Sequence, residues 1–260
     1  MYKTISISTD TRGVATLTLD RAEKHNAMSA EMLAELTDAA VVLGADAKVR
    51  VVILTGAGKT FCAGGDLAWM KAQMAADPET RFVEARKLAE MLFGLNTMPK
   101  PLIGRLQGNA FGGGVGMAAV CDVAIGTTDV TMALTETKLG LIPATIGPYV
   151  AARMGEARAR RVFMSGRPFK GPEAVDLGLL ARAVAPEDLD DAIEAEVAPY
   201  LQTAPAAVAR AKALLRHLGP PITTEVIDHS IGELVACWEG SEAPEGIGAF
   251  FAKTKPSWQS

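Results

Sequence analysis

The sequence has few residues of the types on which several common protein chemistries depend. Its 260 residues include three cysteines, three tryptophans and three tyrosines. An odd number of cysteines without paired spacing gives neither a disulfide framework nor a zinc site. Scarce tryptophan and tyrosine leave no evident platform for stacking nucleic-acid bases. The histidines, His25, His217 and His229, also lack metal-ligand spacing, so we expect no metal site.

Long apolar runs and a large charge of one sign are also missing. No apolar run approaches the roughly 20 residues of a membrane-spanning helix, and residues 1–8 show no apolar run of the signal-peptide type. A net charge of −4 argues against nucleic acid or an acidic membrane as the main partner. We therefore expect a cytoplasmic protein that binds neither nucleic acid nor membranes.

The chain does contain enough apolar material for one full core. Hydrophobic residues make up 49% of it and charged residues 22%, as is typical of ordinary globular domains. Alternating or continuous apolar segments predict strands over residues 4–8, 14–19, 50–55, 102–106 and 123–125. Apolar residues on one helical face predict helices between these strands, from a cap at Ser29 to about Leu43 and over about 79–95.

Beyond Pro143 the strand signals nearly stop. Proline and glycine there separate stretches with helical periodicity, over about 156–164, 172–177, 189–201, 205–218 and 225–239. A front part of repeated strand-turn-helix units and a helical back part predict an α/β core followed by an all-helical C-terminal part.

Two glycine-rich junctions between a strand and a helix are the most informative feature. In one, Leu106–Gly114 runs from an apolar strand into three consecutive glycines, and Asp122 follows. In the other, the strand at 51–55 leads into Phe61–Leu67. The start of a helix leaves backbone N–H groups without partners, and glycine lets a ligand oxygen approach them. Two such junctions could therefore converge on one oxygen atom.

The chain resembles the crotonase superfamily, the enoyl-CoA hydratase/isomerase group. The resemblance rests on three blocks in order, which are Ala63–Leu67, the glycine cluster with Asp122, and Glu136–Pro143, and it extends from Arg21–Met28 to Ala249–Pro256. It implies an α/β fold, a crotonase-like spiral of ββα units over 1–200 with a helical C-terminal trimerisation region over 201–260. It also implies a homotrimer or homohexamer.

In that family two backbone amides stabilise a thioester enolate, and a carboxylate moves protons. Carried onto this sequence, the resemblance assigns the amides to Gly65 and Gly113 and the carboxylate to Glu136. Apolar neighbours such as Pro143 favour a raised pKa for Glu136. The structural alternatives are that the glycines serve only tight turns and that Glu136 is a solvated residue at a helix start.

The substrate implied by the resemblance is an acyl-CoA thioester, so no separate cofactor is expected. The residues that the family likeness assigns to coenzyme A are Lys24, Ala27, Ala63, Asp66, Leu67, Phe250 and Lys253. The lysines suit phosphate groups as mobile charges, although each is equally consistent with ordinary surface charge. Asp66 is equally consistent with a helix cap.

One departure from the best-known hydratases leaves the reaction open. They carry a second glutamate two residues beyond the third glycine, where this chain has Gly116. Addition of water usually employs two carboxylates, whereas moving a double bond needs one. The short sequence segments that contain Trp69, Met70 and Gly116 resemble those of hydratases that act on branched glutaconyl-type thioesters. These three residues are expected in the acyl pocket. We therefore predict a hydratase, with 3-methylglutaconyl-CoA of leucine breakdown as the leading substrate. The alternatives are an enoyl-CoA isomerase and a non-catalytic or RNA-binding relative.

Overall fold

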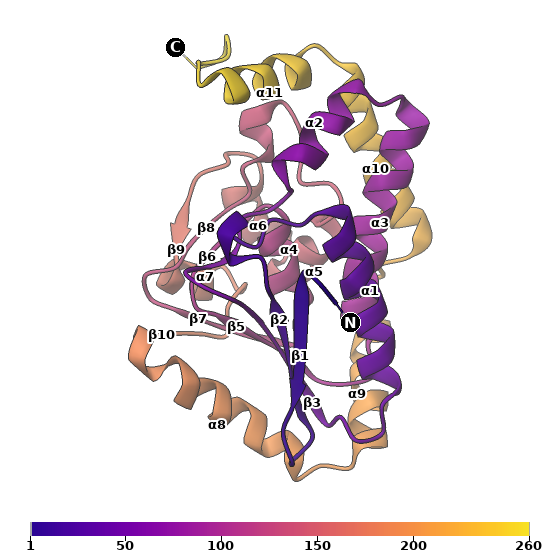
Figure 1. Cartoon of the computed structure of the whole chain (residues 1–260), viewed down its shortest axis with the longest axis vertical. Helices are drawn as coiled ribbons and strands as arrows, with labels where there is room; N and C mark the ends of the chain where they lie inside the picture. The colour runs from indigo at the N-terminus through magenta and orange to yellow at the C-terminus, as the bar shows by residue number, and fades with distance from the viewer. Residues whose placement is uncertain (1, 260) are drawn as a thin grey trace.

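The structure is a computed structural model that describes residues 2–259. A six-stranded sheet forms its centre (Figure 1). Its strands, in spatial order, are β1 (Ile5–Thr9), β2 (Val14–Leu19), β3 (Val51–Gly56), β5 (Leu102–Leu106), β7 (Val123–Thr127) and β10 (Arg182–Val184). β1 is antiparallel to β2 across the predicted hairpin, and the remaining neighbours are parallel.

A second, four-stranded sheet consists of very short strands. In spatial order they are β4 (Thr60–Cys62), β6 (Asn109–Phe111), β8 (Thr131–Ala133) and β9 (Phe169–Lys170). The chain passes from β3 to β4, from β5 to β6 and from β7 to β8, so each long strand is followed by a short strand in the other sheet and then by helical structure. This repeat is the predicted ββα spiral, and it confirms the expected α/β fold class.

Helices surround the two sheets. The α-helices are α1 (Ala30–Ala45), α2 (Leu67–Ala75), α3 (Pro78–Thr97), α4 (Gly113–Val120), α5 (Gly147–Met154), α6 (Glu156–Phe163), α7 (Gly171–Asp176), α8 (Leu189–Leu201), α9 (Pro205–Leu218), α10 (Thr224–Glu239) and α11 (Glu242–Ala252). Single 3₁₀ turns are η1 (Ala22–Lys24), η2 (Glu136–Leu139) and η3 (Pro186–Asp188). Across the described residues no helix is both long and apolar enough to cross a membrane.

The prediction for α1 illustrates how local chemistry determines an element. The Ser29 hydroxyl accepts a hydrogen bond from the amide of Met32, which satisfies one of the free N–H groups of the first turn. The predicted apolar face is the buried face, formed by Met32, Leu33, Leu36, Ala39, Ala40 and Leu43. It packs into the main core, and α1 lies along α3.

Beyond Pro143 the described chain is mainly helical, as predicted, but it also contains two short strands that the sequence did not predict. Both β9 and β10 lie there, with two and three residues respectively. Each is too short to show an apolar period of its own. Each is a strand because it pairs with a neighbouring strand, β9 with β8 and β10 with β7. The helix α5 also lies in this part and was not predicted.

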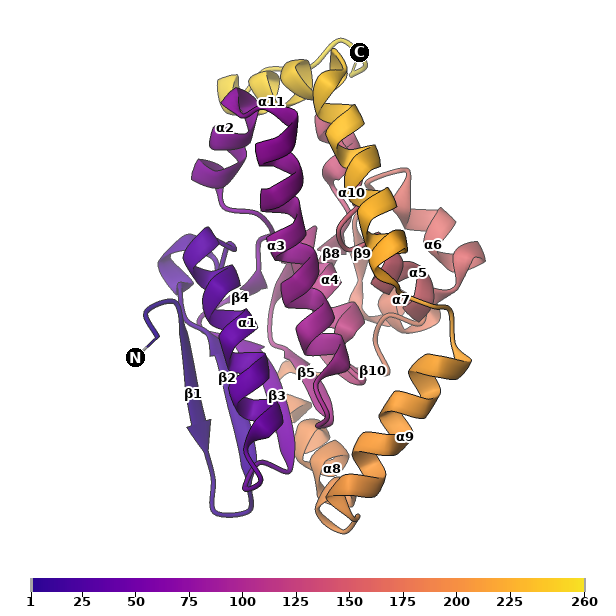
Figure 2. The ribbon, with the colours of Figure 1, turned by 90° about the vertical axis from the view of Figure 1, so that its right-hand side faces the viewer.

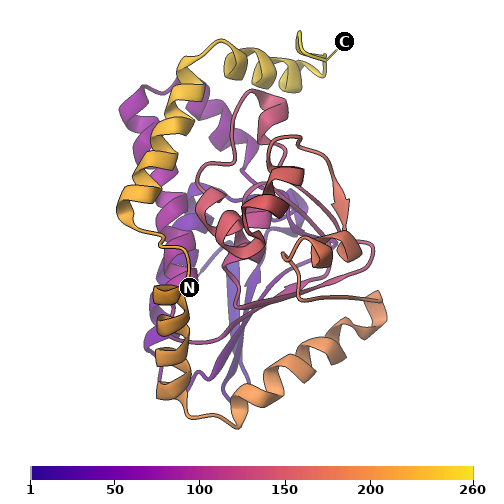
Figure 3. The ribbon, with the colours of Figure 1, turned by 180° about the vertical axis from the view of Figure 1, so that it is seen from behind.

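After Leu201 the described chain consists of three helices with short connecting segments and contains no strand. α10 lies beside α3, and α9 continues along the same side of the molecule (Figure 2). The view from behind shows α11 crossing the end of the molecule beyond α10 (Figure 3). α11 contacts η2 of the same chain, so the last helix reaches back to the middle of the sequence. The division of the chain at residue 200 stays a prediction.

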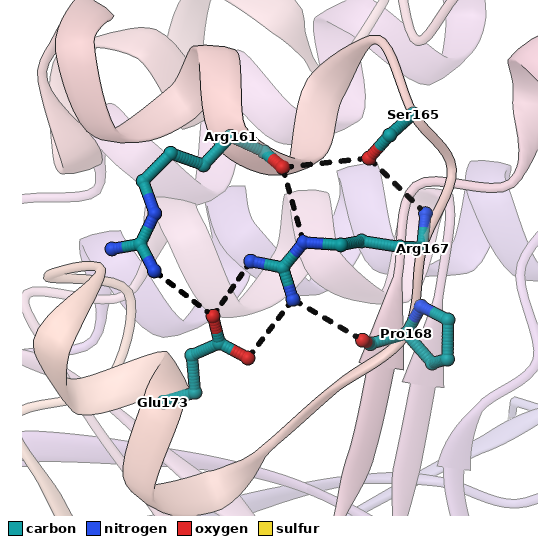
Figure 4. A network of polar contacts seen from close by, with 5 residues as sticks. All are labelled: Arg161, Ser165, Arg167, Pro168 and Glu173. Carbon is teal, nitrogen blue, oxygen red and sulfur yellow. Dashed lines mark hydrogen bonds and ion pairs between the residues drawn. The ribbon is translucent and has the colours of Figure 1, made fainter.

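A polar network holds the loop between α6 and α7 (Figure 4). The carboxylate of Glu173 accepts hydrogen bonds from Arg161 and from two nitrogens of Arg167, at 3.2, 3.0 and 2.6 Å. Within this loop Gly166 has φ +60°, and a Cβ there would lie 3.2 Å from Cε of Lys138. The network therefore fixes a loop that packs directly against η2.

Candidate active site

A buried asparagine shapes the loop that enters the site. Asn26 is fully buried and has φ +54°, a left-handed conformation that asparagine tolerates better than most residues. Its amide nitrogen donates to the carbonyls of Ala57 and Thr60 at 2.9 and 2.8 Å. Its amide oxygen accepts from the N–H of Arg21 at 2.9 Å. These bonds fix the position of the two residues that follow.

The end of this loop pairs with the first glycine junction. Met28 donates to the carbonyl of Gly64 at 2.8 Å and accepts from the N–H of Asp66 at 3.1 Å, which makes a parallel bridge to Gly65. In such a bridge the polar groups of the opposite residue point away from the pair. The N–H of Gly65 therefore faces away from Met28, and it has no acceptor among residues 2–259.

The second junction presents an equivalent amide. Gly112 has φ +48°, and its N–H donates to Ala133 at 2.9 Å. Gly113 is the first residue of α4, so its own N–H has no intrahelical partner. No other acceptor in the described chain takes it up. Two free amides, one from each junction, are therefore present.

The two junctions lie against each other. A Cβ on Gly64 would lie 3.9 Å from the amide nitrogen of Gly113, and a Cβ on Gly113 would lie 2.0 Å from Cε of Met28. Real Cβ atoms essentially never approach another atom that closely, so a side chain at Gly113 would displace the end of the Met28 side chain. Met28 thereby links the loop that pairs with Gly65 to the start of α4.

Glu136 opens η2 and points at the same glycine turn. Its Oε1 lies 2.9 Å from the place that a Cβ of Gly112 would occupy. The residue keeps part of its surface exposed, but Oε2 is buried and has no hydrogen-bond partner in the described part of the chain. Burial raises the pKa of Glu136 to about 7, against a smaller lowering effect of its own backbone N–H. This carboxyl is therefore not the solvated alternative considered from the sequence.

The space beside Gly116 is filled. A Cβ on Gly116 would lie 2.3 Å from Cγ2 of Ile146 and 3.7 Å from Cδ1 of Leu92. A glutamate side chain has no room there unless Ile146 moves, so the departure from the two-glutamate pattern extends to the packing around it. Among the described residues, Glu136 is therefore the carboxylate at this glycine turn, and Gly116 stands where two-glutamate hydratases have their second glutamate.

Trp69 and Met70 lie beside the first amide, and their place in an acyl pocket stays a prediction. Trp69 Cε3 and Met70 Cγ are 3.8 and 3.9 Å from the place of a Cβ on Gly65. The indole Nε1 of Trp69 is buried and has no acceptor in the described structure. Buried indole N–H groups ordinarily find a partner, so this donor is available to a ligand.

The residues predicted for coenzyme A are distributed over three segments. Lys24 ends η1, Ala27 precedes Met28, and Ala63 donates its N–H to the carbonyl of His25 at 3.0 Å. The side chain of Leu67 is 52% exposed. Phe250 and Lys253 lie exposed on α11 and at its C-terminal end. Their role in binding the coenzyme stays a prediction.

Asp66 is fully engaged within the protein. One oxygen caps α2 by accepting from Ala68 at 2.8 Å, and the other accepts from the Arg21 guanidinium at 3.1 Å. Arg21 also donates to the carbonyl of Ala27 at 2.6 Å. Both side chains are largely buried. The helix-cap interpretation of Asp66 is therefore present in the structure, together with an ion pair that ties the two loops.

Sequence reasoning missed four residues that support the site, namely Arg21, Asn26, Met28 and Ile146. Asn26 left a weak signal, because asparagine between short loop residues is typical of a left-handed turn. The other three act through contacts with distant segments, and nothing in their local sequence indicates those contacts.

Two other features of the described chain contribute nothing to this site. No group of three or more His, Cys, Asp or Glu side chains within it could hold a metal ion. A cavity of about 790 Å³ between α3, α5 and α9 is lined by Asp122, Arg153 and Lys212 among others, and it includes neither the two amides nor Glu136.

Comparison with known proteins gives one consistent result. The family model for enoyl-CoA hydratase/isomerase matches residues 9–260. The crystal structure of an enoyl-CoA hydratase from Shewanella pealeana is 34% identical, covers 99% of this chain and 97% of that chain, and superimposes with a TM-score of 0.81. The crystal structure of an enoyl-CoA hydratase from Mycobacterium smegmatis is 35% identical, covers 99% of this chain and 100% of that chain, and superimposes with a TM-score of 0.80. An enoyl-CoA hydratase of Alternaria alternata is 32% identical over 78% of this chain and 67% of its own length.

Proposed function

Since this chain belongs to the enoyl-CoA hydratase/isomerase family, whose members act on acyl-CoA thioesters, we propose that it adds water across the double bond of a 2-enoyl-CoA. The observation that carries the proposal is the placement of Glu136, with a pKa of about 7, at the glycine turn of Gly112 and Gly113, against which the junction of Gly64 and Gly65 packs. The amides of Gly65 and Gly113 have no acceptor among the described residues. Each of these groups has an unused hydrogen-bond donor or acceptor that a substrate can engage.

The amides of Gly65 and Gly113 would bind the thioester carbonyl oxygen. During addition of water, negative charge develops on this oxygen as the thioester becomes an enolate. Donors fixed in advance stabilise that charge without reorganisation, and loss of one such donor typically costs about 2.7–4 kcal/mol. The parallel bridge at Met28 and the helix start at Gly113 fix these donors.

Glu136 would move the protons. Its carboxylate removes a proton from water as the water oxygen bonds to C3, and the carboxylic acid then delivers a proton to C2. One water molecule is consumed, and the carboxylate is regenerated. A pKa near 7 suits both steps, because the group then exchanges protons readily in either direction near neutral pH.

The substrate that we propose is a branched glutaconyl-type thioester, such as 3-methylglutaconyl-CoA. Support comes from the likeness of segments 66–70, 114–117 and 143–150 to hydratases of that class. Further support is the unpartnered Nε1 of Trp69 beside Gly65, which offers a donor to an oxygen of the acyl group. Lys24, Lys253 and Phe250 are proposed contacts of the coenzyme.

Isomerisation of a 3-enoyl-CoA to a 2-enoyl-CoA is the second candidate. The observation that favours it is the side chain of Ile146 at Gly116, which leaves no room for a second glutamate at that position. One base suffices for this reaction, because it takes a proton from C2 and returns it at C4. The same two amides would hold the dienolate oxygen.

Products formed in H₂¹⁸O distinguish the two reactions. Heavy oxygen in the product of a 2-enoyl-CoA marks hydration, and conversion of a 3-enoyl-CoA without added oxygen marks isomerisation. Glu136→Gln should lower kcat by roughly 10² to 10⁴, the usual contribution of a general acid–base residue, while Glu156→Gln on the exposed face of α6 is the control. If Glu136→Gln stays within about threefold of the parent enzyme, which is roughly 0.65 kcal/mol, the mechanism is wrong. Binding of RNA without turnover of any CoA ester would favour the non-catalytic alternative.

A further inference from the structure

The last helix touches the segment of Glu136 through two glycines. A Cβ on Gly246 of α11 would lie 2.6 Å from the carbonyl carbon of Leu139 and 2.7 Å from its oxygen. In the reverse direction, a Cβ on Gly140 would lie 2.4 Å from the carbonyl carbon of Glu242. Each glycine thus faces backbone of the other element, and the two backbones approach more closely than any side chain would allow.

Apolar side chains complete this contact. Leu141, Trp238, Ala243 and Ile247 form a small buried cluster, and Leu139 packs against it. The N–H of Leu141 donates to the carbonyl of Glu136 at 3.1 Å, so the cluster is joined to the first residue of η2 by a backbone bond. The charged residues Lys138 and Glu242 of the two elements are exposed and lie outside the cluster.

We propose that α11 is a positioning element for Glu136, because the contact of Gly246 with the Leu139 backbone sets the depth at which η2 places the carboxyl beside Gly112. The proposal rests on the role of Glu136 proposed above. A backbone contact transmits displacement directly, since neither partner has a flexible side chain that could absorb it. Movement of α11 by the size of one methyl group must therefore move η2, or separate it from the helix.

The chain supplies a matched control on the same helix. Gly248 lies two residues after Gly246, and a Cβ placed on it would meet nothing within 4 Å. Gly246→Ala and Gly248→Ala therefore make the same change in composition and helix propensity, and only the first adds an atom against η2. Any difference between the two variants reports the contact.

The test is the pH dependence of kcat/KM for both variants. We expect Gly246→Ala to lower kcat between about tenfold and a hundredfold, the loss associated with a misplacement of roughly 1 Å. We also expect the midpoint of the ascending limb of the kcat/KM profile against pH to move below pH 7, because water that reaches the carboxyl of Glu136 lowers its pKa toward the usual value for glutamate. Gly248→Ala should keep the parent rate and midpoint. A general loss of folded protein would reduce the rate without moving the midpoint.

Ile247→Ala provides a second measurement if Gly246→Ala folds poorly. Ile247 is fully buried in the same cluster, and its truncation loosens α11 without adding an atom near η2. Its midpoint should move in the same direction by a smaller amount. Unchanged midpoints in Gly246→Ala and Ile247→Ala would overturn the positioning role while Glu136→Gln remains inactive, whereas an active Glu136→Gln would instead overturn the proposed function.

Discussion

Replacing Glu136 by glutamine should stabilise the protein at alkaline pH while removing its activity. Burial raises the pKa of this carboxyl from 4.5 to about 7. An acid with a higher pKa in the folded protein than in the unfolded chain costs the folded state free energy once it ionises. Its contribution to stability is therefore complete below about pH 4.5 and is lost as the pH rises to 7. At 1.36 kcal/mol for each pKa unit, the loss reaches about 3 kcal/mol.

Urea unfolding at pH 5 and pH 8 measures this cost. The stability of Glu136→Gln relative to the parent should increase by about 2.5 kcal/mol between these two pH values, because most of the ionisation window lies between them. Any effect of the new amide group on local packing is the same at both pH values and cancels. Glu156→Gln, whose carboxyl is exposed and paired with Arg160, should show no comparable change. An equally flat response of Glu136→Gln would refute the argument that this carboxyl is buried without a partner.

Three further predictions address the supports of the site. Gly116→Glu should destabilise the protein by about 1–3 kcal/mol, the usual cost of overpacking, and Ile146→Ala in the same chain should recover part of it in urea unfolding. Arg21→Gln should lower kcat more than it changes KM, since its ion pair fixes the loop beside the first amide, while Arg12→Gln at an exposed ion pair should leave steady-state kinetics unchanged. Arg167 lowers the pKa of Glu173 below its usual 4.5, so Glu173→Gln should lower the melting temperature at pH 7, and the difference should shrink progressively as the pH falls below 4.5; a difference that stays constant as the pH falls would contradict this.

The main sheet could be predicted because its strands have patterns of their own. The segment 14–19 and the segment 102–106 are strands with the predicted bounds, since a buried parallel strand needs a run of apolar residues. β4 and β8, by contrast, have three residues each. Three residues contain no measurable period, and the second sheet exists because neighbouring strands supply the hydrogen bonds.

The residues of the candidate site likewise fall into those that the sequence could predict and those that it could not. Gly65, Gly113 and Glu136 could be proposed because family blocks mark them, and glycine at Gly113 has a local reason in the start of α4. The supporting contacts of Met28, Ile146 and α11 could not be predicted, because each acts on a residue far away in the chain. Methionine and isoleucine at such positions are indistinguishable from core residues until the partner glycine is located.

The packing contacts around the site and the polar groups proposed for catalysis have opposite effects on the stability of the protein. The amide of the buried Gly113 and one carboxyl oxygen of Glu136 lack partners in the described protein, and a buried polar group without a partner costs about 1–3 kcal/mol. A chain free to relax would turn these groups toward one another or toward water. Met28 packs against Gly113 at one amide, and the backbone of Leu139, in the segment that carries the carboxyl, packs against Gly246. Binding strength for an enolate is therefore stored in groups that the fold keeps unsatisfied, so removing the unpaired carboxyl charge in Glu136→Gln should raise stability and lower turnover together.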